Sequence, residues 1–193
     1  MSNAYRTKNS TGLINKNKKI NFSFNGHTYH GYEGDTLASA LISNGIHLIG
    51  RSFKYHRPRG FLGVGVEEPN AMVQLHEGNK SEPNIIATEV ELVEGLKAKS
   101  QNCWPSVQFD IGEVNNLLNR FFPAGFYYKT FMWPKSFWMK IYEPFIRKAA
   151  GMGVAPLQPD PDRYEHNYEH CDVLVVGSGP SGLASALAAA KNG

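Results

Sequence analysis

The chain has 193 residues, of which 41% are hydrophobic and 19% are charged, and its formal net charge is +3. This length and composition predict a globular protein with one sizeable core and room for a second, partial unit, and the charge alone indicates no nucleic-acid or anionic-membrane partner. No apolar run approaches the roughly 20 residues of a membrane span, and the polar N-terminus lacks the apolar core of a secretory signal, so we expect a cytoplasmic protein without a membrane partner.

The chain begins with a polar segment at residues 1–19, in which four lysines lie among serine, asparagine and threonine. Such a composition predicts a mobile basic arm. The two cysteines, Cys103 and Cys171, are too few for a disulfide framework or for a metal site built from cysteine. We therefore expect two reduced thiols.

Residues 20–100 carry the pattern of a mixed α+β domain. Residues 20–24 alternate apolar and polar, Asn25-Gly26 is a tight turn, and residues 27–32 return as a second strand. Thr36 is the predicted N-cap of a helix that Asn44-Gly45 ends. Further strands are predicted at residues 46–49, 71–76 and 88–93. This order of elements is typical of a β-grasp fold of the mixed α+β class.

Cations alternate with aromatic residues in the segment Arg-Ser-Phe-Lys-Tyr-His-Arg-Pro-Arg-Gly at residues 51–60. Cations can contact phosphates while aromatic rings stack on bases, so this loop leaves open a non-enzymatic binding module for nucleic acid or a phosphate ligand. The alternative is a structural loop whose arginines bridge backbone carbonyls or acidic side chains. We favour the structural loop because only one such segment exists.

Two adjacent carboxylates follow at Glu67 and Glu68. A carboxylate pair can perform acid/base catalysis, but adjacent side chains on extended backbone point to opposite sides. We therefore predict a solvated pair, and the sequence offers no catalytic residues elsewhere.

Residues 101–170 read as an aromatic helical extension and a linker. Asp110 is the predicted N-cap of a helix reaching Phe122, residues 125–134 are aromatic and extended, and residues 136–150 predict a second amphipathic helix. The aromatic stripe predicts packing against another domain or subunit. His166 and His170 lie beside glutamates in the linker, but a flexible linker supplies no closed metal site, so no metal is predicted.

Residues 171–193 predict the start of a Rossmann-type α/β domain. An apolar run at residues 172–176 predicts a strand, an alanine-rich run at residues 183–191 predicts a helix, and G-x-G-x-x-G lies between them. The predicted cofactor-binding residues are Gly177, Ser178, Gly179, Pro180, Ser181 and Gly182. The second strand and the acidic residue that would hold a ribose do not fit before residue 193, so we expect an incomplete domain of a longer protein, with the choice between NAD and FAD left open.

Several long sequence segments resemble those of a known family. They are Gly-Asp-Thr-Leu-Ala-Ser-Ala-Leu at residues 34–41, the segment at 50–60, Glu-Glu-Pro-Asn-Ala at 67–71, Ser-Gln-Asn-Cys-Trp-Pro-Ser at 100–106, and the segments at 125–134 and 171–182. Over roughly residues 12–193 the chain resembles the N-terminal part of the alpha subunit of heterotetrameric sarcosine oxidases.

This resemblance implies a subunit of an oxidoreductase that demethylates sarcosine to glycine, with oxygen reduced to peroxide and the one-carbon unit passed to tetrahydrofolate. It implies beta, gamma and delta subunits as partners, NAD held by the intact alpha subunit, and FAD and FMN held elsewhere in the complex. We expect the 193-residue chain alone to be inactive. The organisation that the sequence and the resemblance imply is a flexible basic arm at 1–19, a ferredoxin-like β-grasp domain at 20–100, an extension and linker at 101–170, and the start of a dinucleotide-binding domain at 171–193.

Amino-acid and opine dehydrogenase cousins of this subunit have a cysteine-bearing loop for a two-iron cluster where this sequence has residues 60–68. The segment contains no cysteine here, and cluster ligation takes about four thiolates. The sequence therefore predicts a β-grasp domain without an iron–sulfur cluster. An iron–sulfur dehydrogenase subunit is the alternative that a bound cluster would support.

Overall fold

The computed structural model describes residues 5–7, 12–121, 125, 131, 133–153 and 155–192. The chain divides into two compact units, Met1–Pro161 and Asp162–Gly193. The strands are β1 (Asn15–Phe24), β2 (His27–Glu33), β3 (Gly50–Arg51), β4 (Pro58–Arg59), β5 (Met72–Leu75), β6 (Glu82–Ile86) and β7 (Lys97–Ser100). The α-helices are α1 (Leu37–Ser43), α2 (Val114–Leu117), α4 (Glu143–Ala149) and α5 (Pro180–Asn192). A π-helical segment lies at Trp138–Tyr142, and 3-10 turns lie at Gly78–Lys80, Ile111–Glu113, Asn119–Phe121 and Lys135–Phe137.

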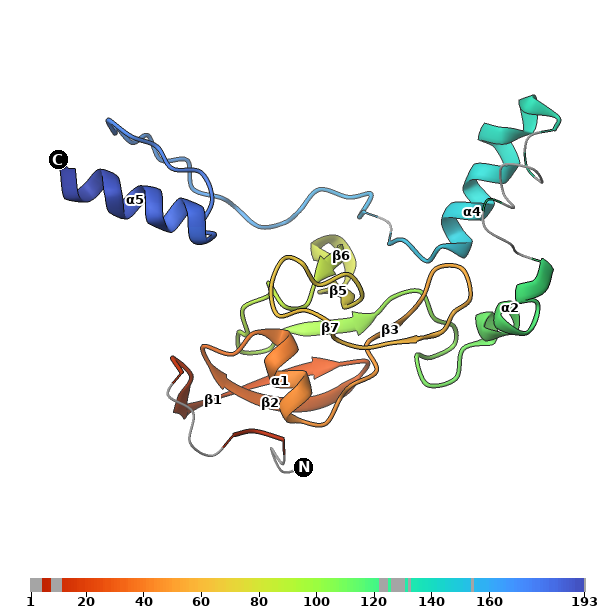
Figure 1. Ribbon diagram of the computed structural model, residues 1–193, viewed down its shortest axis with the longest axis horizontal. Coiled ribbons are helices and arrows are strands. Elements are labelled where there is room, and N and C mark those ends of the chain that lie inside the picture. The colour runs from red at the N-terminus through yellow and green to blue at the C-terminus, as the bar shows by residue number, and fades with distance from the viewer. Residues whose placement is uncertain are drawn as a thin grey trace. The chain divides into compact units, whose positions relative to one another are not determined.

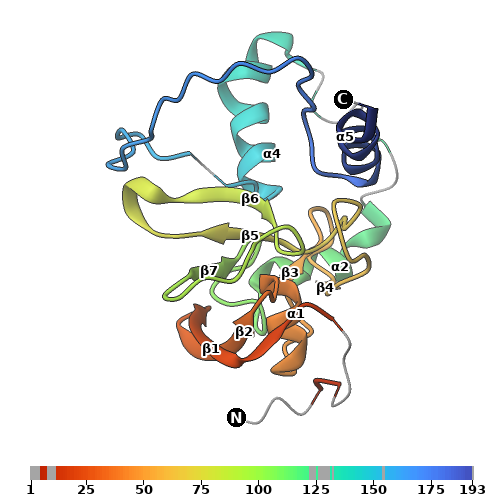
Figure 2. The same ribbon diagram turned by 90° about the vertical axis from the view of Figure 1, so that its left-hand side faces the viewer.

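A five-stranded sheet in the order β2-β1-β7-β5-β6 forms the centre of the first unit (Figures 1 and 2). β1 pairs antiparallel with β2 and parallel with β7, whereas β5 pairs antiparallel with both β6 and β7. β3 and β4 form a separate antiparallel ribbon. The predicted α+β class is confirmed.

The hairpin of β1 and β2 follows from local sequence, as predicted. Ile20, Phe22 and Phe24 alternate along β1 and are all buried, which fixes the face that this strand turns to the core. Asn25 and Gly26 both have positive φ, 50° and 80°, as a two-residue hairpin turn requires. β1 begins at Asn15, so residues 15–19, expected in the basic arm, belong to the strand.

Helix α1 begins and ends at the predicted signals. Thr36 accepts a hydrogen bond from the Ser39 amide, and the Ser39 side chain accepts one from the Thr36 amide, which makes a capping box. The helix stops at Asn44, and Gly45 follows with φ of +78°. The capped helix presents a buried face to the sheet.

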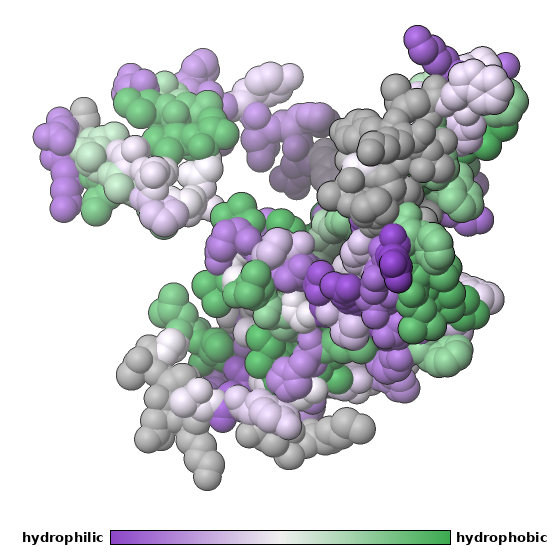
Figure 3. All heavy atoms as spheres, turned by 45° about the vertical axis from the view of Figure 1, so that its right-hand side comes forward, coloured by the Kyte–Doolittle hydropathy of each residue, from purple (hydrophilic) through white to green (hydrophobic). Residues whose placement is uncertain are grey.

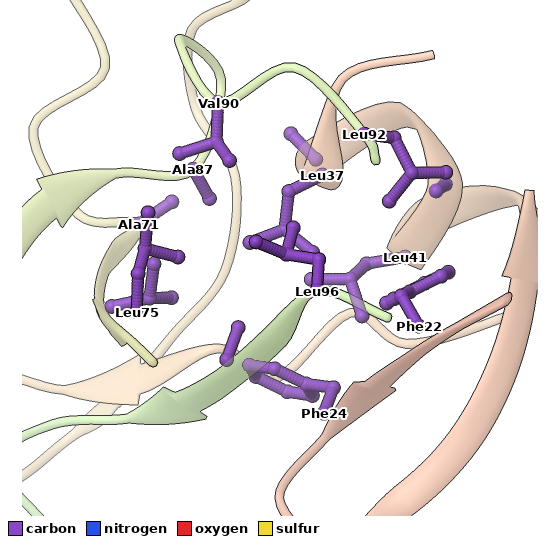
Figure 4. Packing of buried hydrophobic residues seen from close by; sticks show 14 of the residues in the cluster. Phe22, Phe24, Leu37, Leu41, Ala71, Leu75, Ala87, Val90, Leu92 and Leu96 are labelled. Atoms are coloured by element: carbon purple, nitrogen blue, oxygen red, sulfur yellow. The ribbon is translucent and has the colours of Figure 1, made fainter. Parts of the chain in front are cut away.

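The core lies between α1 and the sheet (Figure 4). Phe22 and Phe24 of β1 face Leu37 and Leu41 of α1, and other buried side chains, including Leu92 and Leu96, complete the cluster. Gly31 of β2 brings the helix close, because a Cβ atom there would lie 3.0 Å from the Cβ of Ala40. The absence of a side chain at Gly31 thus sets the distance between α1 and the sheet.

Three predicted strands differ from the structure. Residues 46–49 are irregular and β3 starts only at Gly50. Residues 87–89 form a turn and Glu91 makes an isolated bridge, so the strand predicted at 88–93 is wrong and β6 lies before it. The strand predicted at 172–176 is also not formed, because a parallel strand requires a partner and the described part of the second unit supplies none. The strand predicted at 71–76 is confirmed as β5.

The extension is helical, largely where predicted. Asp110 caps the turn before α2 by accepting a hydrogen bond from the Gly112 amide at 3.1 Å. The segment predicted at 136–150 contains the π-helical turn and α4. Phe122 and most of the aromatic stretch at 125–134 lie outside the described residues.

Apolar side chains of the extension reach the surface instead of a core (Figure 3). Trp133, Met139 and Phe145 are 83%, 72% and 66% exposed. Among the described residues, no helix is both long enough and apolar enough to cross a membrane.

Candidate functional site

The predicted cofactor-binding residues form the turn that leads into α5. Gly177 has φ of +108°, a conformation that side chains rarely adopt. Ser178 and Gly179 complete the turn, and Pro180, Ser181 and Gly182 are the first residues of the helix. Proline suits this first position because its missing N–H has no intrahelical partner to lose.

Glycine is also required where the turn meets the helix. A Cβ atom at Gly182 would overlap the carbonyl oxygen of Gly177, whereas a Cβ at Gly179 would meet nothing within 4 Å. The Leu183 amide donates to the Gly179 carbonyl at 2.9 Å and begins the helical ladder. The amides of Ser181 and Gly182 lie ahead of this bond, at the end of the helix that attracts anions.

The charges of α5 suit an anion at its start. Its first turn contains no acidic residue, and Lys191 lies in its last turn. An anionic ligand at the turn would therefore meet the positive end of the helix dipole without a neighbouring carboxylate on that helix.

The basic and aromatic loop at 51–60 is a structural hairpin between β3 and β4. Arg51 is buried, and its guanidinium donates to the carbonyls of Val107 at 2.9 Å, His56 at 3.0 Å and Gln108 at 3.2 Å. It also contacts the Glu113 carboxylate at 3.1 Å. The structure thus confirms, for Arg51, the interpretation of an arginine that bridges carbonyls and an acidic side chain.

Other cations of this loop also have partners within the protein. Arg57 donates to the Asn116 side chain at 2.7 Å and lies over the Tyr55 ring, 4.8 Å from its centroid. Lys54 lies 4.9 Å from the centroid of the same ring. Since these groups are engaged internally, the geometry does not favour the nucleic-acid module.

A histidine–carboxylate pair, with His56 partly buried and Asp110 buried, joins the loop to the segment that follows the sheet. The Nδ1 atom of His56 lies 2.6 Å from an Asp110 carboxylate oxygen. The other Asp110 oxygen accepts the amides of Trp104 and Gly112 at 3.0 and 3.1 Å. The sequence indicated Asp110 only as a helix cap, because His56 is far away along the chain.

Cys103 lies beside this pair and lines the same shallow cavity as His56 and Asp110. Burial raises the pKa of its thiol, the Asp110 carboxylate raises it further, and Arg51 opposes both effects. Cys103 is therefore held as a neutral thiol and is poorly suited to act as a thiolate nucleophile.

Glu68 is not the solvated residue that the sequence predicted. Its side chain is buried, and its carboxylate accepts backbone N–H groups from both arms of the loop: Leu62 at 2.6 Å, Gly63 at 2.5 Å, Asn70 at 2.7 Å and Ala71 at 3.2 Å. Burial raises the pKa of Glu68, but these donors outweigh it and lower the pKa overall. The carboxylate is thus a structural anion and not a catalytic acid.

Its neighbour Glu67 is exposed, as predicted. Glu67 accepts the amides of Val64 at 2.9 Å and Gly65 at 3.1 Å, and these bonds lower its pKa. The described residues contain no cluster of three or more metal-ligating side chains, the linker histidines included. Because Glu67 and Glu68 both accept backbone amides of the same loop, they shape that loop and do not share a proton.

Comparison with known proteins identifies the class of the first domain. Residues 17–103 match the family described as Fer2_4, a 2Fe-2S iron-sulfur cluster binding domain. The fold and this match define an α+β domain of the ferredoxin-like class.

Most of the chain also matches larger relatives. It is 58% identical over 182 residues to the sarcosine oxidase subunit alpha of Rhizobium meliloti (strain 1021), a match that covers 94% of this chain and 18% of that protein. It is 31% identical over 183 residues to the alpha subunits of Corynebacterium sp. strains U-96 and P-1, covering 93% of this chain and 14% of each. The chain is homologous to an N-terminal part of sarcosine oxidase alpha subunits, so the resemblance predicted from the sequence is confirmed. It spans less than a fifth of their length.

A crystal structure of L-proline dehydrogenase from P. horikoshii is similar over 44% of this chain and 16% of that chain, with 26% identity and a TM-score of 0.34.

The prediction of no iron–sulfur cluster is corrected by the family match, because the domain at residues 17–103 is of a cluster-binding class. The donor set of this chain fits the cluster poorly. Cys103 is the one cysteine in the matched range, and its thiol is held neutral, whereas ligation takes about four thiolates.

Proposed function

We propose that this chain serves as the N-terminal scaffold of a sarcosine oxidase alpha subunit. The observation that carries the proposal is the 58% identity over 94% of the chain. In the complete enzyme, with beta, gamma and delta subunits, sarcosine is demethylated to glycine, oxygen is reduced to peroxide and the one-carbon unit passes to tetrahydrofolate. The cytoplasm is the proposed location.

In this proposal the chain contributes a structural scaffold and the first part of a dinucleotide-binding site, and it is inactive alone. The ferredoxin-like domain at 20–100 is a scaffold, and residues 101–170 contact another domain or subunit through their exposed aromatic side chains. Residues 171–193 begin a Rossmann-type domain that binds NAD. The open approach at Gly179 and the amides of Ser181 and Gly182 support a role in receiving the NAD pyrophosphate.

The NAD role is tested by titration calorimetry on two proteins, this chain and a chain extended through the remainder of the dinucleotide domain. We expect negligible NAD binding by the short chain, since the described part of its second unit contains no strand, and clear binding by the extended one. In the extended chain, Gly179→Val should weaken binding at least about 10-fold by blocking the pyrophosphate, whereas Gly12→Ala should not. Tight binding by the short chain, or none by the extended chain, contradicts the proposed NAD role.

The role in the complex is tested with the full-length subunit coexpressed with the other three subunits. Peroxide release is measured with sarcosine as the substrate. Activity that requires the alpha subunit supports the proposal, whereas full activity after deletion of its first 170 residues contradicts the scaffold role.

A further inference from the structure

A short segment near the N-terminus, residues 5–7, packs on the ferredoxin-like domain although the sequence predicted a mobile arm there. The side chain of Arg6 is only 12% exposed. Its Nη1 and Nη2 atoms donate to the two carboxylate oxygens of Asp35 at 3.1 and 2.6 Å, and Nη2 also donates to the Ser43 hydroxyl at 3.0 Å. This is the two-pronged geometry by which a guanidinium recognises a carboxylate.

The acceptor side of this contact is built without the arm. The Asp35 side chain is 0% exposed, and it is held by the Tyr32 amide at 2.8 Å and the Ser39 hydroxyl at 2.7 Å. Ser43 is buried in α1 and its hydroxyl donates to the Ala40 carbonyl at 2.8 Å, which leaves its oxygen to accept. Removing Arg6 would therefore leave the Asp35 carboxylate positioned by Tyr32 and Ser39 but without its cation.

Aromatic and glycine residues complete the walls of the site. The Tyr32 ring lies 5.0 Å from the guanidinium carbon of Arg6. Tyr5 packs edge-on against the His47 ring at 5.4 Å, and a Cβ atom at Gly45 would lie 2.9 Å from the Tyr5 ring. Gly45 thus ends α1 and also leaves space for the arm.

We propose that Asp35, Ser43 and Tyr32 form a guanidinium-binding site and that residues 5–7 are its intramolecular ligand. The site recognises the two Nη groups, because the Nε atom of Arg6 is buried without a hydrogen-bond partner in the described part of the chain. A peptide or small molecule with a terminal guanidinium therefore carries the required chemistry. An ammonium does not, since it cannot span both carboxylate oxygens with a rigid fork.

The test uses the chain without residues 1–7 and the peptides acetyl-Tyr-Arg-Thr-amide and acetyl-Tyr-Lys-Thr-amide. We expect the shortened chain to unfold at a temperature lower by roughly 10 °C. The arginine peptide at millimolar concentration should restore part of this loss in a saturable manner, and the lysine peptide should restore less. An unchanged unfolding temperature, or equal effects of the two peptides, overturns the proposal.

A second arm of the experiment applies if the shortened chain does not fold. The full chain with Arg6→Gln is titrated with ethylguanidinium or ethylammonium at millimolar concentration, and Arg120→Gln, at an exposed arginine, is the matched control. We expect ethylguanidinium to raise the unfolding temperature of the Arg6→Gln variant and not that of the Arg120→Gln variant. Equal responses of the two variants, or of the two cations, count against a guanidinium site.

Discussion

At the scale of single residues, Glu68 shows how a carboxylate can act as the centre of a loop. Its two oxygens collect amides from both arms of the loop, so the chain between Phe61 and Ala71 closes around one charge. The sequence could not reveal this role, because its partners are backbone amides, which every residue except proline provides. The role of Arg6 was not predicted for a different reason, since its partner Asp35 lies 29 residues away along the chain.

Replacing Glu68 by glutamine should destabilise the first unit by about 2 to 4 kcal/mol. The side-chain NH2 group of glutamine is a donor, and it would face backbone N–H groups that now donate to a carboxylate oxygen. The loss is measured by urea unfolding at neutral pH. Glu67→Gln, which affects exposed bonds only, should change stability much less. Equal losses in the two variants would contradict the role given to burial.

The same residue predicts a pH dependence. The pKa of Glu68 is lowered from its ordinary value of 4.5, so its contribution is complete above that pH and is lost as the pH falls through the folded pKa. The stability difference between the native chain and Glu68→Gln should therefore be constant near neutral pH and shrink as the pH falls below about 4.5. A constant difference would show that the charge of Glu68 is not what stabilises the loop.

At the scale of elements, the sequence predicted those whose signals are local. The β1–β2 hairpin and α1 have their turn and cap residues next to their apolar residues. β7 was not predicted, because its sequence Lys-Ala-Lys-Ser is polar and it becomes a strand through pairing with distant β1 and β5. The apolar run at 172–176 shows the opposite case, in which strand propensity without a partner forms no strand.

For the candidate site, the sequence predicted the glycine turn and its helix but not the contacts that hold the first domain together. G-x-G-x-x-G is a contiguous signal, and the positive φ of Gly177 and the close approach at Gly182 explain why glycine is needed at both positions. The contact of His56 with Asp110 joins residues 54 positions apart, so only the folded chain shows it.

The packing of α1 on the sheet predicts the effect of a single methyl group. Gly31→Ala should destabilise the first unit by about 1 to 3 kcal/mol, because the new Cβ would crowd the side chains of Leu92 and Ala40. Gly12→Ala, where a Cβ meets nothing within 4 Å, is the control and should be close to neutral. The unfolding temperatures of the two variants are compared. An unchanged unfolding temperature in Gly31→Ala would show that helix α1 can shift freely.

At the scale of the whole molecule, the two units are joined by an exposed segment. Residues 157–170 are exposed and contain no helix or strand, and the boundary between the units falls within them. We expect brief digestion with trypsin to cut first after Arg163 and to leave residues 17–103 intact, as mass spectrometry would show. Arg163→Gln should remove that first cut, and an initial cut within 17–103 would contradict the division.

The pairing of β1 with β7 has a consequence for synthesis of the protein. Ser23 and Phe24 of β1 lie opposite Lys97 and Ala98 of β7. β1 therefore cannot complete its pairing until β7, the last strand of this sheet, has been synthesised. During that interval the apolar faces of the hairpin and α1 have no completed core to enter, although both can form locally. Nascent chains paused before residue 97 should therefore be recognised by chaperones, and those paused well beyond residue 100 should be released.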